Sequence, residues 1–175
     1  MLLQRFRRGD REAFAALVVR YQRPIYNAAL AILRRPEDAS DVTQTVFLKI
    51  VERGDGYDPQ YKLFSWLYRI AVNESLDLLR RGRRDVPLDD ELDVPDADAH
   101  GPEALLSEVE MSTRIHRSVM SMSVNDRVVL TLRHFSDCSY EQMAEILELD
   151  EKTVKSRLFE ARRRLRGLLG DLGSD

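Results

Sequence analysis

One stretch near the middle of the chain divides it into two parts and so limits the folds it can adopt. Residues 82–102 contain three prolines and two glycines and show little hydrophobic periodicity. From Asp85 to Glu110 there are ten acidic residues and no lysine or arginine. A segment of this composition buries too little apolar surface to fold by itself. We therefore predict two domains, residues 1–81 and 103–175, joined by an acidic flexible linker, residues 82–102; a chain of 175 residues is long enough for both.

Both flanking parts carry apolar residues at spacings of three and four, and alternating patterns typical of strands are scarce. The predicted fold class is all-α, with two small helical bundles. The expected helices span about 11–21, 24–33, 37–53 and 63–81 in the first bundle, and about 103–120, 125–135, 140–147 and the residues after Asp150 in the second.

Two helices of the first bundle have clear inward and outward faces. The helix over 37–53 is expected to bury Ala39, Val42, Val46 and Ile50. The helix over 63–81 is expected to bury Phe64, Leu67, Ala71 and Leu78 and to place Arg69, Asn73 and Arg80 on a polar face. The aromatic side chains of Phe64, Trp66 and Tyr68 are interpreted as packing residues, because aromatics at helical spacing are more often core than stacking platforms.

Charge is segregated along the chain although the formal net charge is only −3. Residues 62–84 carry a net charge of +4 and residues 151–169 a net charge of +5, on either side of the acidic stretch. This pattern indicates two surfaces that face a polyanion, such as nucleic acid. The alternative is that the charges belong to ordinary solvated helix faces.

The end of the chain has the pattern of a helix-turn-helix. Ser139 and Gln142 fit a capping box at the start of one helix, and Asp150 can cap the next. The second helix is expected to turn these residues inward: Val154, Leu158, Ala161, Leu165 and Leu168. Lys152, Lys155, Ser156 and either Arg162 or Arg163 then point outward, flanked by Thr153 and Arg157. The first turn of such a helix enters the DNA major groove, where Arg, Lys, Ser and Thr can contact base edges and phosphates.

Several other classes of protein are disfavoured. The single cysteine, Cys138, excludes an internal disulfide framework, and no apolar run approaches the length of about 18 residues needed to span a bilayer. The first ten residues lack a secretory pattern, so we expect a cytoplasmic protein without membrane insertion. No motif of an enzyme is recognisable. His134 and Cys138 lie four residues apart but are too few to hold a metal, and we expect no metal or other cofactor.

Five segments occur in an order that is typical of one protein family. They are EAFAALVVRYQ at 12–22, DASDVTQTVFL at 38–48, WLYRIAVN at 66–73, SYEQMAEIL at 139–147 and TVKSRLFEARRRLR at 153–166. With them the chain resembles an extracytoplasmic-function (ECF) sigma factor of bacterial RNA polymerase over nearly its whole length. Two local differences are Ser123-Val124, where the family often begins a helix with proline, and Glu148, at a turn position that family members often fill with glycine.

The resemblance implies promoter recognition, promoter melting and transcription initiation, often in stress responses. It implies that the clamp of the largest polymerase subunit is contacted by Asp38, Asp41, Gln44 and Phe47. It implies that the downstream promoter element is contacted by the loop over 54–62 and the helix after it, through Tyr61, Lys62, Arg69, Asn73 and Arg80. It implies that the upstream element is read by Lys152, Thr153, Lys155, Ser156 and Arg157. The flap of the polymerase beta subunit and an anti-sigma factor are further expected partners.

Two alternatives remain open at this point. One is an autonomous helix-turn-helix regulator that binds DNA without polymerase, as a dimer across a two-fold site. The other is a helical adaptor that binds only proteins. Salt-sensitive retention on DNA separates the adaptor from both DNA-binding readings, because binding to phosphates weakens steeply with salt.

Overall fold

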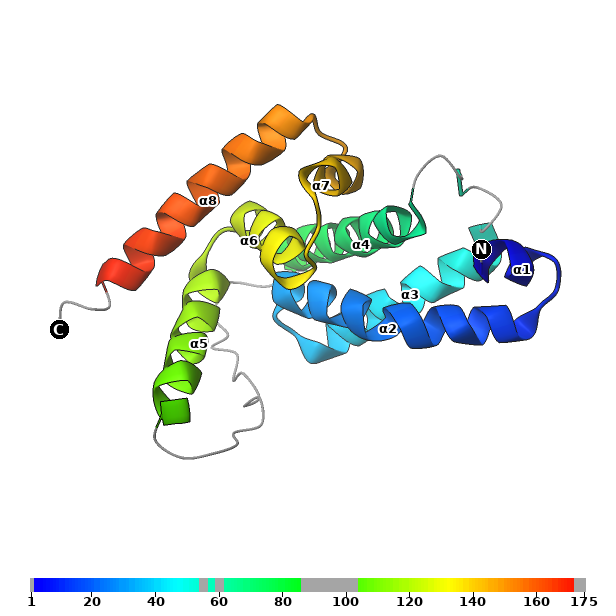
Figure 1. Ribbon diagram of the computed structural model, residues 1–175, viewed down its shortest axis with the longest axis horizontal. Coiled ribbons are helices and arrows are strands. Elements are labelled where there is room, and N and C mark those ends of the chain that lie inside the picture. The colour runs from blue at the N-terminus through cyan, green and yellow to red at the C-terminus, as the bar shows by residue number, and fades with distance from the viewer. Residues whose placement is uncertain (1, 54–56, 59–61, 86–103, 172–175) are drawn as a thin grey trace.

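The computed structural model describes residues 2–53, 57–58, 62–85 and 104–171, and every element within these ranges is helical (Figure 1). The helices are α1 (Leu2–Arg7), α2 (Arg11–Leu33), α3 (Pro36–Arg53) and α4 (Leu63–Asp85) in the N-terminal half. The C-terminal half contains α5 (Ala104–Ser121), α6 (Val124–Leu130), η2 (Thr131–Phe135), α7 (Tyr140–Leu147) and α8 (Glu151–Asp171). The expected all-α class with two helical regions is confirmed. The predicted linker lies largely outside the described residues.

Helix α2 differs from the prediction of two helices divided before Pro24. It is continuous from Arg11 to Leu33 with Pro24 inside it, so the predicted break is wrong. A proline removes one backbone hydrogen bond and crowds the preceding turn, at a cost of about 3 kcal/mol. Pro24 lies on the exposed side, whereas Leu17 and Ile25 on either side of it are fully buried. Burial of one apolar stripe along the whole helix therefore outweighs the local defect.

The buried faces of α3 and α4 hold the N-terminal bundle together. Ala39, Val42, Val46 and Ile50 are at most 1% exposed, which confirms the predicted stripe of α3. On α4, Leu67 and Ala71 are buried as predicted, while Phe64 and Leu78 are only half-buried. The Lys49 ammonium also contacts the Glu74 carboxylate, which links α3 to α4 at the edge of this core.

The segment between α5 and the helix-turn-helix is less regular than the single helix predicted over 125–135. Ser123 caps α6, and its hydroxyl oxygen accepts a hydrogen bond from the Asp126 backbone N–H. The last turn widens, because the Ser136 N–H donates to the Thr131 carbonyl five residues earlier at 3.0 Å. This wide turn ends the helix and leads the chain into α7.

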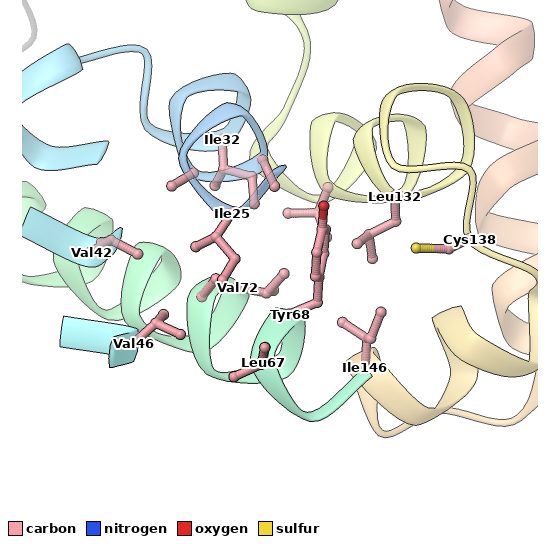
Figure 2. Close-up of a cluster of buried hydrophobic side chains, with 14 of the residues drawn as sticks. Ile25, Ile32, Val42, Val46, Leu67, Tyr68, Val72, Leu132, Cys138 and Ile146 are labelled. Atoms are coloured by element: carbon pink, nitrogen blue, oxygen red, sulfur yellow. The ribbon is translucent and has the colours of Figure 1, made fainter. Parts of the chain in front are cut away.

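The two halves share one buried cluster. Helix α4 packs against α7, and α2 packs against α6 and η2. Figure 2 shows Tyr68 between Val72 of its own helix and Leu132 and Ile146 of the C-terminal half. Tyr68 is 1% exposed, and its predicted packing role is confirmed. Because the two halves pack against each other, each half covers part of the other half's surface.

Candidate nucleic-acid interface

The helix-turn-helix is built by local hydrogen bonds that the sequence predicted. The Gln142 N–H donates to the Ser139 hydroxyl oxygen at 3.1 Å, and the Ser139 N–H donates to the Gln142 side-chain oxygen at 2.8 Å. This capping box starts α7, which ends at Glu148 in a left-handed conformation with φ 54°. A glycine would adopt this conformation without steric cost, whereas the Cβ atom of Glu148 makes it less favourable.

Helix α8 is fixed at its start by Asp150. One carboxylate oxygen of Asp150 accepts the Thr153 N–H at 2.8 Å, and the other accepts the Thr153 hydroxyl at 2.7 Å. These hydrogen bonds, first the one from the Thr153 side chain, lower the pKa of Asp150 below its usual value. The cap confirms the predicted helix start. It engages the hydroxyl of Thr153, a residue that the sequence analysis placed beside the outward-pointing residues of this helix.

The inward stripe of α8 is only partly as predicted. Val154, Leu158 and Ala161 are at most 1% exposed, but Leu165 is half-buried and Leu168 is exposed. The prediction was wrong for Leu168, because this side chain lines an open pocket with Met122 and Asp126 instead of packing against them.

The outward side of the first turns of α8 is basic and open. Lys152, Lys155, Ser156 and Arg157 are all exposed, as the sequence predicted. The Lys155 ammonium lies 2.9 Å from the Glu151 carboxylate and 5.2 Å from the centre of the Tyr140 ring. A lysine held by one neighbouring carboxylate and one aromatic face is pre-oriented but still accessible to a phosphate.

The basic face of α4 is divided by the C-terminal half. Asn73 and Arg80 are exposed, and Arg80 pairs with Asp77 at 2.8 Å. Arg69, by contrast, is half-buried, and its Nη1 lies 3.4 Å from the Oε1 atom of Glu148 in the helix-turn-helix turn. Lys62 is exposed just before α4, while Tyr61 lies outside the described residues.

The acidic face of α3 is open at two of its four predicted positions. Asp41 and Gln44 are exposed, whereas Asp38 is half-buried and lies 3.6 Å from Arg35. Phe47 is 9% exposed and packs edge-on against the Phe14 ring at 6.3 Å between centroids. Phe47 therefore supports the face from inside the core.

Two apolar residues extend this face of α3 and were missed by the sequence reasoning. Leu48 is 58% exposed and Val51 is 55% exposed. Both follow Asp41 and Gln44 at intervals of three and four residues, so helical periodicity could have revealed them. Next to them, a shallow groove between α2 and α3 includes Val19, 83% exposed, and Gln44.

His134 contacts a neighbouring side chain, and Cys138 lies in the core. The His134 Nε2 atom accepts a hydrogen bond from the Arg162 Nε–H at 3.2 Å, and the pKa of His134 is lowered by burial and by the Arg162 charge. Cys138 is fully buried, and burial raises its pKa to about 12. Among the residues that the structure describes, no group of three or more acidic, histidine or cysteine side chains could hold a metal ion. Nor does any helix in the described ranges have the length and apolar content to cross a membrane.

Comparison with known proteins shows which family has this sequence and this arrangement of helices. The sequence pattern of Sigma-70 region 2 matches residues 17–85, and that of Sigma-70 region 4 matches residues 112–165. The chain is 34% identical to the ECF RNA polymerase sigma-E factor of Escherichia coli K12, over 93% of this chain and 89% of that protein. The chain belongs to the ECF sigma factors of RNA polymerase.

Other similar proteins agree with this family. The RNA polymerase sigma-H factor of Pseudomonas aeruginosa is 33% identical over 92% of this chain and 88% of its own length. The ECF RNA polymerase sigma factor SigW of Bacillus subtilis is 30% identical over 97% of this chain and 96% of its own length. The solved structure of CnrH, in complex with the cytosolic domain of CnrY, is similar with a TM-score of 0.72 and 25% identity, over 97% of this chain and 96% of CnrH. The sigma factor RpoE of Bartonella quintana shares the fold with a TM-score of 0.73 and 23% identity, over 90% of this chain and 96% of RpoE.

The two halves of the chain correspond to two named regions of this family, region 2 and region 4. Region 2 contains most of α2 and all of α3 and α4, and region 4 contains the helix-turn-helix. A sigma factor joins core RNA polymerase and directs it to promoter DNA, and this is the function of the chain. The exposed basic residues of α4 and α8 and the acidic face of α3 are the candidate surfaces for binding DNA and polymerase.

Proposed function

We propose that this sigma factor reads the upstream promoter element with the first turns of α8. The observation that carries this assignment is the exposed set Lys152, Lys155, Ser156 and Arg157 on a helix whose start is fixed by the Asp150 cap. The N-terminal turns of a recognition helix reach base edges, and lysine and arginine donate to guanine acceptors or phosphates there. Thr153 contributes by holding the cap while its side chain stays half-buried.

The downstream promoter element is assigned to the start and the exposed face of α4. Lys62, Asn73 and Arg80 are exposed on it, and the half-buried Arg69, which contacts Glu148, lies on the same helix. Tyr61 belongs to the same proposed surface. An element that melts offers unpaired bases, which are held by polar edge contacts and a basic groove.

The clamp of the largest polymerase subunit is assigned to the exposed face of α3. Asp41 and Gln44, with Asp38 beside them and Phe47 beneath, are the polar part of this surface. Leu48 and Val51 supply the apolar area that a stable protein interface needs at its centre. Acidic groups around an apolar centre suit a basic partner surface. The flap of the beta subunit is assigned to region 4.

Two domains, residues 1–81 and 103–175, and a connecting segment, residues 82–102, remain our proposed division. The matched ranges 17–85 and 112–165 support it. We also propose that the protein works in the cytoplasm without catalytic activity, metal or cofactor. An anti-sigma factor is the proposed regulator; the similar sigma factor RpoE was solved with an anti-sigma factor.

The test separates polymerase binding from promoter reading. The purified full chain is mixed with bacterial core RNA polymerase without DNA, and co-elution is measured by size-exclusion chromatography. Asp41→Arg should abolish co-elution, whereas Glu12→Arg, a charge reversal of an exposed acid on α2, should not. Equal effects of both reversals would overturn the assignment of α3. Binding to DNA without any co-elution would favour an autonomous regulator.

Promoter reading is tested by Lys155→Ala in the assembled holoenzyme. The loss of one base or phosphate contact should weaken binding to the upstream element by about 5- to 150-fold, which corresponds to about 1–3 kcal/mol. Arg163→Ala, which removes an exposed charge farther along α8, is the matched control and should change binding little. If both variants weaken binding equally, the contact is general electrostatic attraction to DNA rather than reading by the first turns.

A further inference from the structure

A third basic surface lies at the turn between α1 and α2, far along the chain from the basic segments of α4 and α8. Residues 2–23 contain six arginines and two acidic residues, which gives a net side-chain charge of +4. The arginines are all exposed: Arg5, Arg7, Arg8, Arg11, Arg20 and Arg23. The first four, at positions 5, 7, 8 and 11, lie on either side of the turn and form what we call the basic corner.

The backbone of the basic corner is fixed by local hydrogen bonds. The Gly9 N–H donates to the Phe6 carbonyl at 2.9 Å. The Asp10 N–H donates to the Arg5 carbonyl at 3.1 Å. Together these bonds end α1 as a Schellman motif, and Gly9 supplies the left-handed residue that the motif requires, with φ 91°. Asp10 then caps α2 by accepting the Ala13 N–H at 3.1 Å, so the arginines are carried by a backbone of defined path.

The apolar side of α1 anchors the basic corner to the core of region 2. A helix of six residues is not stable alone, so packing must hold it. Leu3 is 1% exposed, and the centroids of the Phe6 and Phe14 rings lie 4.9 Å apart. Phe14 in turn packs edge-on against Phe47 of α3. Because the apolar side faces the core, the arginines of α1 face the solvent.

The basic corner lies at the same end of the bundle as the start of α4. Tyr57 is 5% exposed, and its ring centroid lies 5.5 Å from that of Trp66 on α4. Burial raises the pKa of Tyr57, and the nearby Arg7 charge opposes this rise. Arg7 therefore acts on a residue that packs against the first turns of α4, close in sequence to the exposed Lys62. In Figure 1, α1 lies beside the end of α3, whereas α8 lies at the other end of the molecule.

This position favours a single strand of DNA as the ligand of the basic corner. The surface of α4 is proposed to hold a promoter element that melts, and the melted strand continues beyond the bases held there. Each further nucleotide carries one phosphate, to which an arginine can donate two hydrogen bonds. Phe6 and Phe14, the aromatic residues of the corner, pack toward the core, so the expected contacts are to phosphates rather than to bases.

We propose that the basic corner binds the phosphates of the melted promoter strand where it continues past the downstream element. This inference rests on the proposed role of α4 in binding that element. The contact is independent of the base sequence. It stabilises the melted state of the promoter, because a ligand surface that fits only the melted strand shifts the equilibrium toward that state.

The test measures binding of the free full-length chain to an oligothymidylate of about 20 nucleotides by fluorescence anisotropy at several salt concentrations. Arg8→Ala combined with Arg11→Ala should raise Kd about fivefold and lower the slope of log Kd against log salt concentration by about 1.4. Arg34→Ala combined with Arg35→Ala removes two exposed charges at the other end of α2 and is the matched control. It should change Kd by less than about twofold.

A gain of binding is expected from the opposite change at the same corner. Glu12→Arg, at an exposed position in the first turn of α2, should lower Kd about fivefold, and unfolding cannot produce such a gain. An unchanged Kd in the corner variant would refute the proposal. Equal losses in the corner variant and its control would refute it as well, since binding would then follow total charge rather than position.

Two other probes separate the possible ligands. A DNA duplex of the same length should be held mainly by α8, so the corner variant should weaken its binding less than about twofold. An equal loss with duplex and single strand would overturn the single-strand assignment. If the corner variant loses binding to polyglutamate but not to oligothymidylate, the ligand is an acidic protein and the proposal falls.

Arg80→Ala distinguishes failure of this inference from failure of the proposed role of α4. A loss of oligothymidylate binding in the corner variant without a loss in Arg80→Ala would count against the assignment of α4 and support the basic corner. A loss in Arg80→Ala alone would overturn the basic corner and leave the assignment of α4 in place.

Discussion

The substitution Tyr68→Ala should both destabilise the protein and uncouple its two halves. Tyr68 is 1% exposed, and its ring contacts side chains of region 2 and region 4 at once. Truncation of a fully buried aromatic side chain lowers the free energy of unfolding by about 3–5 kcal/mol, because the neighbouring side chains fill the cavity only partly. For a chain of 175 residues this corresponds to a fall in melting temperature of about 6–20 °C. Part of the loss falls on the contact between the halves, so each half should then unfold on its own.

The chain offers one native probe in each half for this experiment. Trp66 is its single tryptophan and lies on α4, and Cys138 is its single cysteine and lies before α7. Urea unfolding is followed by tryptophan fluorescence and by thiol reactivity under the same conditions. In the wild type the two transitions should coincide, as expected for one cooperative unit.

In Tyr68→Ala the two transitions should separate as well as move to lower urea. Tyr21→Ala, which truncates a half-buried tyrosine on α2, serves as the control and should shift both transitions together. Separate transitions in the wild type would refute the reasoning, since the shared cluster would then not couple the halves. Coincident transitions in Tyr68→Ala would show that Tyr68 is not the residue that couples them.

Two further predictions concern stability. Arg34 ends α2 in the left-handed region at φ 68°, so Arg34→Gly should raise the free energy of unfolding by about 1 kcal/mol, measured by urea denaturation, whereas Arg35→Gly beside it should not. The pKa of His134 is lowered in the folded protein by burial and by Arg162, so its contribution to stability is complete above pH 6.5 and is lost as the pH falls toward the folded value. Melting curves should show this loss in the wild type, and His134→Gln should reduce it; an identical pH profile in the variant would contradict the assignment.

Local patterns in the sequence were enough for much of the fold and the candidate site. The stripe of α3, the capping box of α7 and the Asp150 cap of α8 each depend on residues within about one or two turns of each other, and all three are present. The exposed basic set at the start of α8 follows from the same periodicity. Propensity failed at Pro24, where burial along the whole helix overrode a local helix breaker.

Composition and periodicity by themselves determined that the chain is helical, that an acidic segment lies between two helical parts, and where the last helix begins. The tertiary structure alone decided that Tyr68 joins the two cores, that Arg127 caps a helix 95 residues away, and that Arg69 faces Glu148 across 79 residues. The physical reason is range. Caps and helical stripes are fixed by neighbours along the chain, whereas a contact between two amphipathic bundles depends on which apolar faces meet in space, and many pairings of such faces satisfy the same sequence pattern.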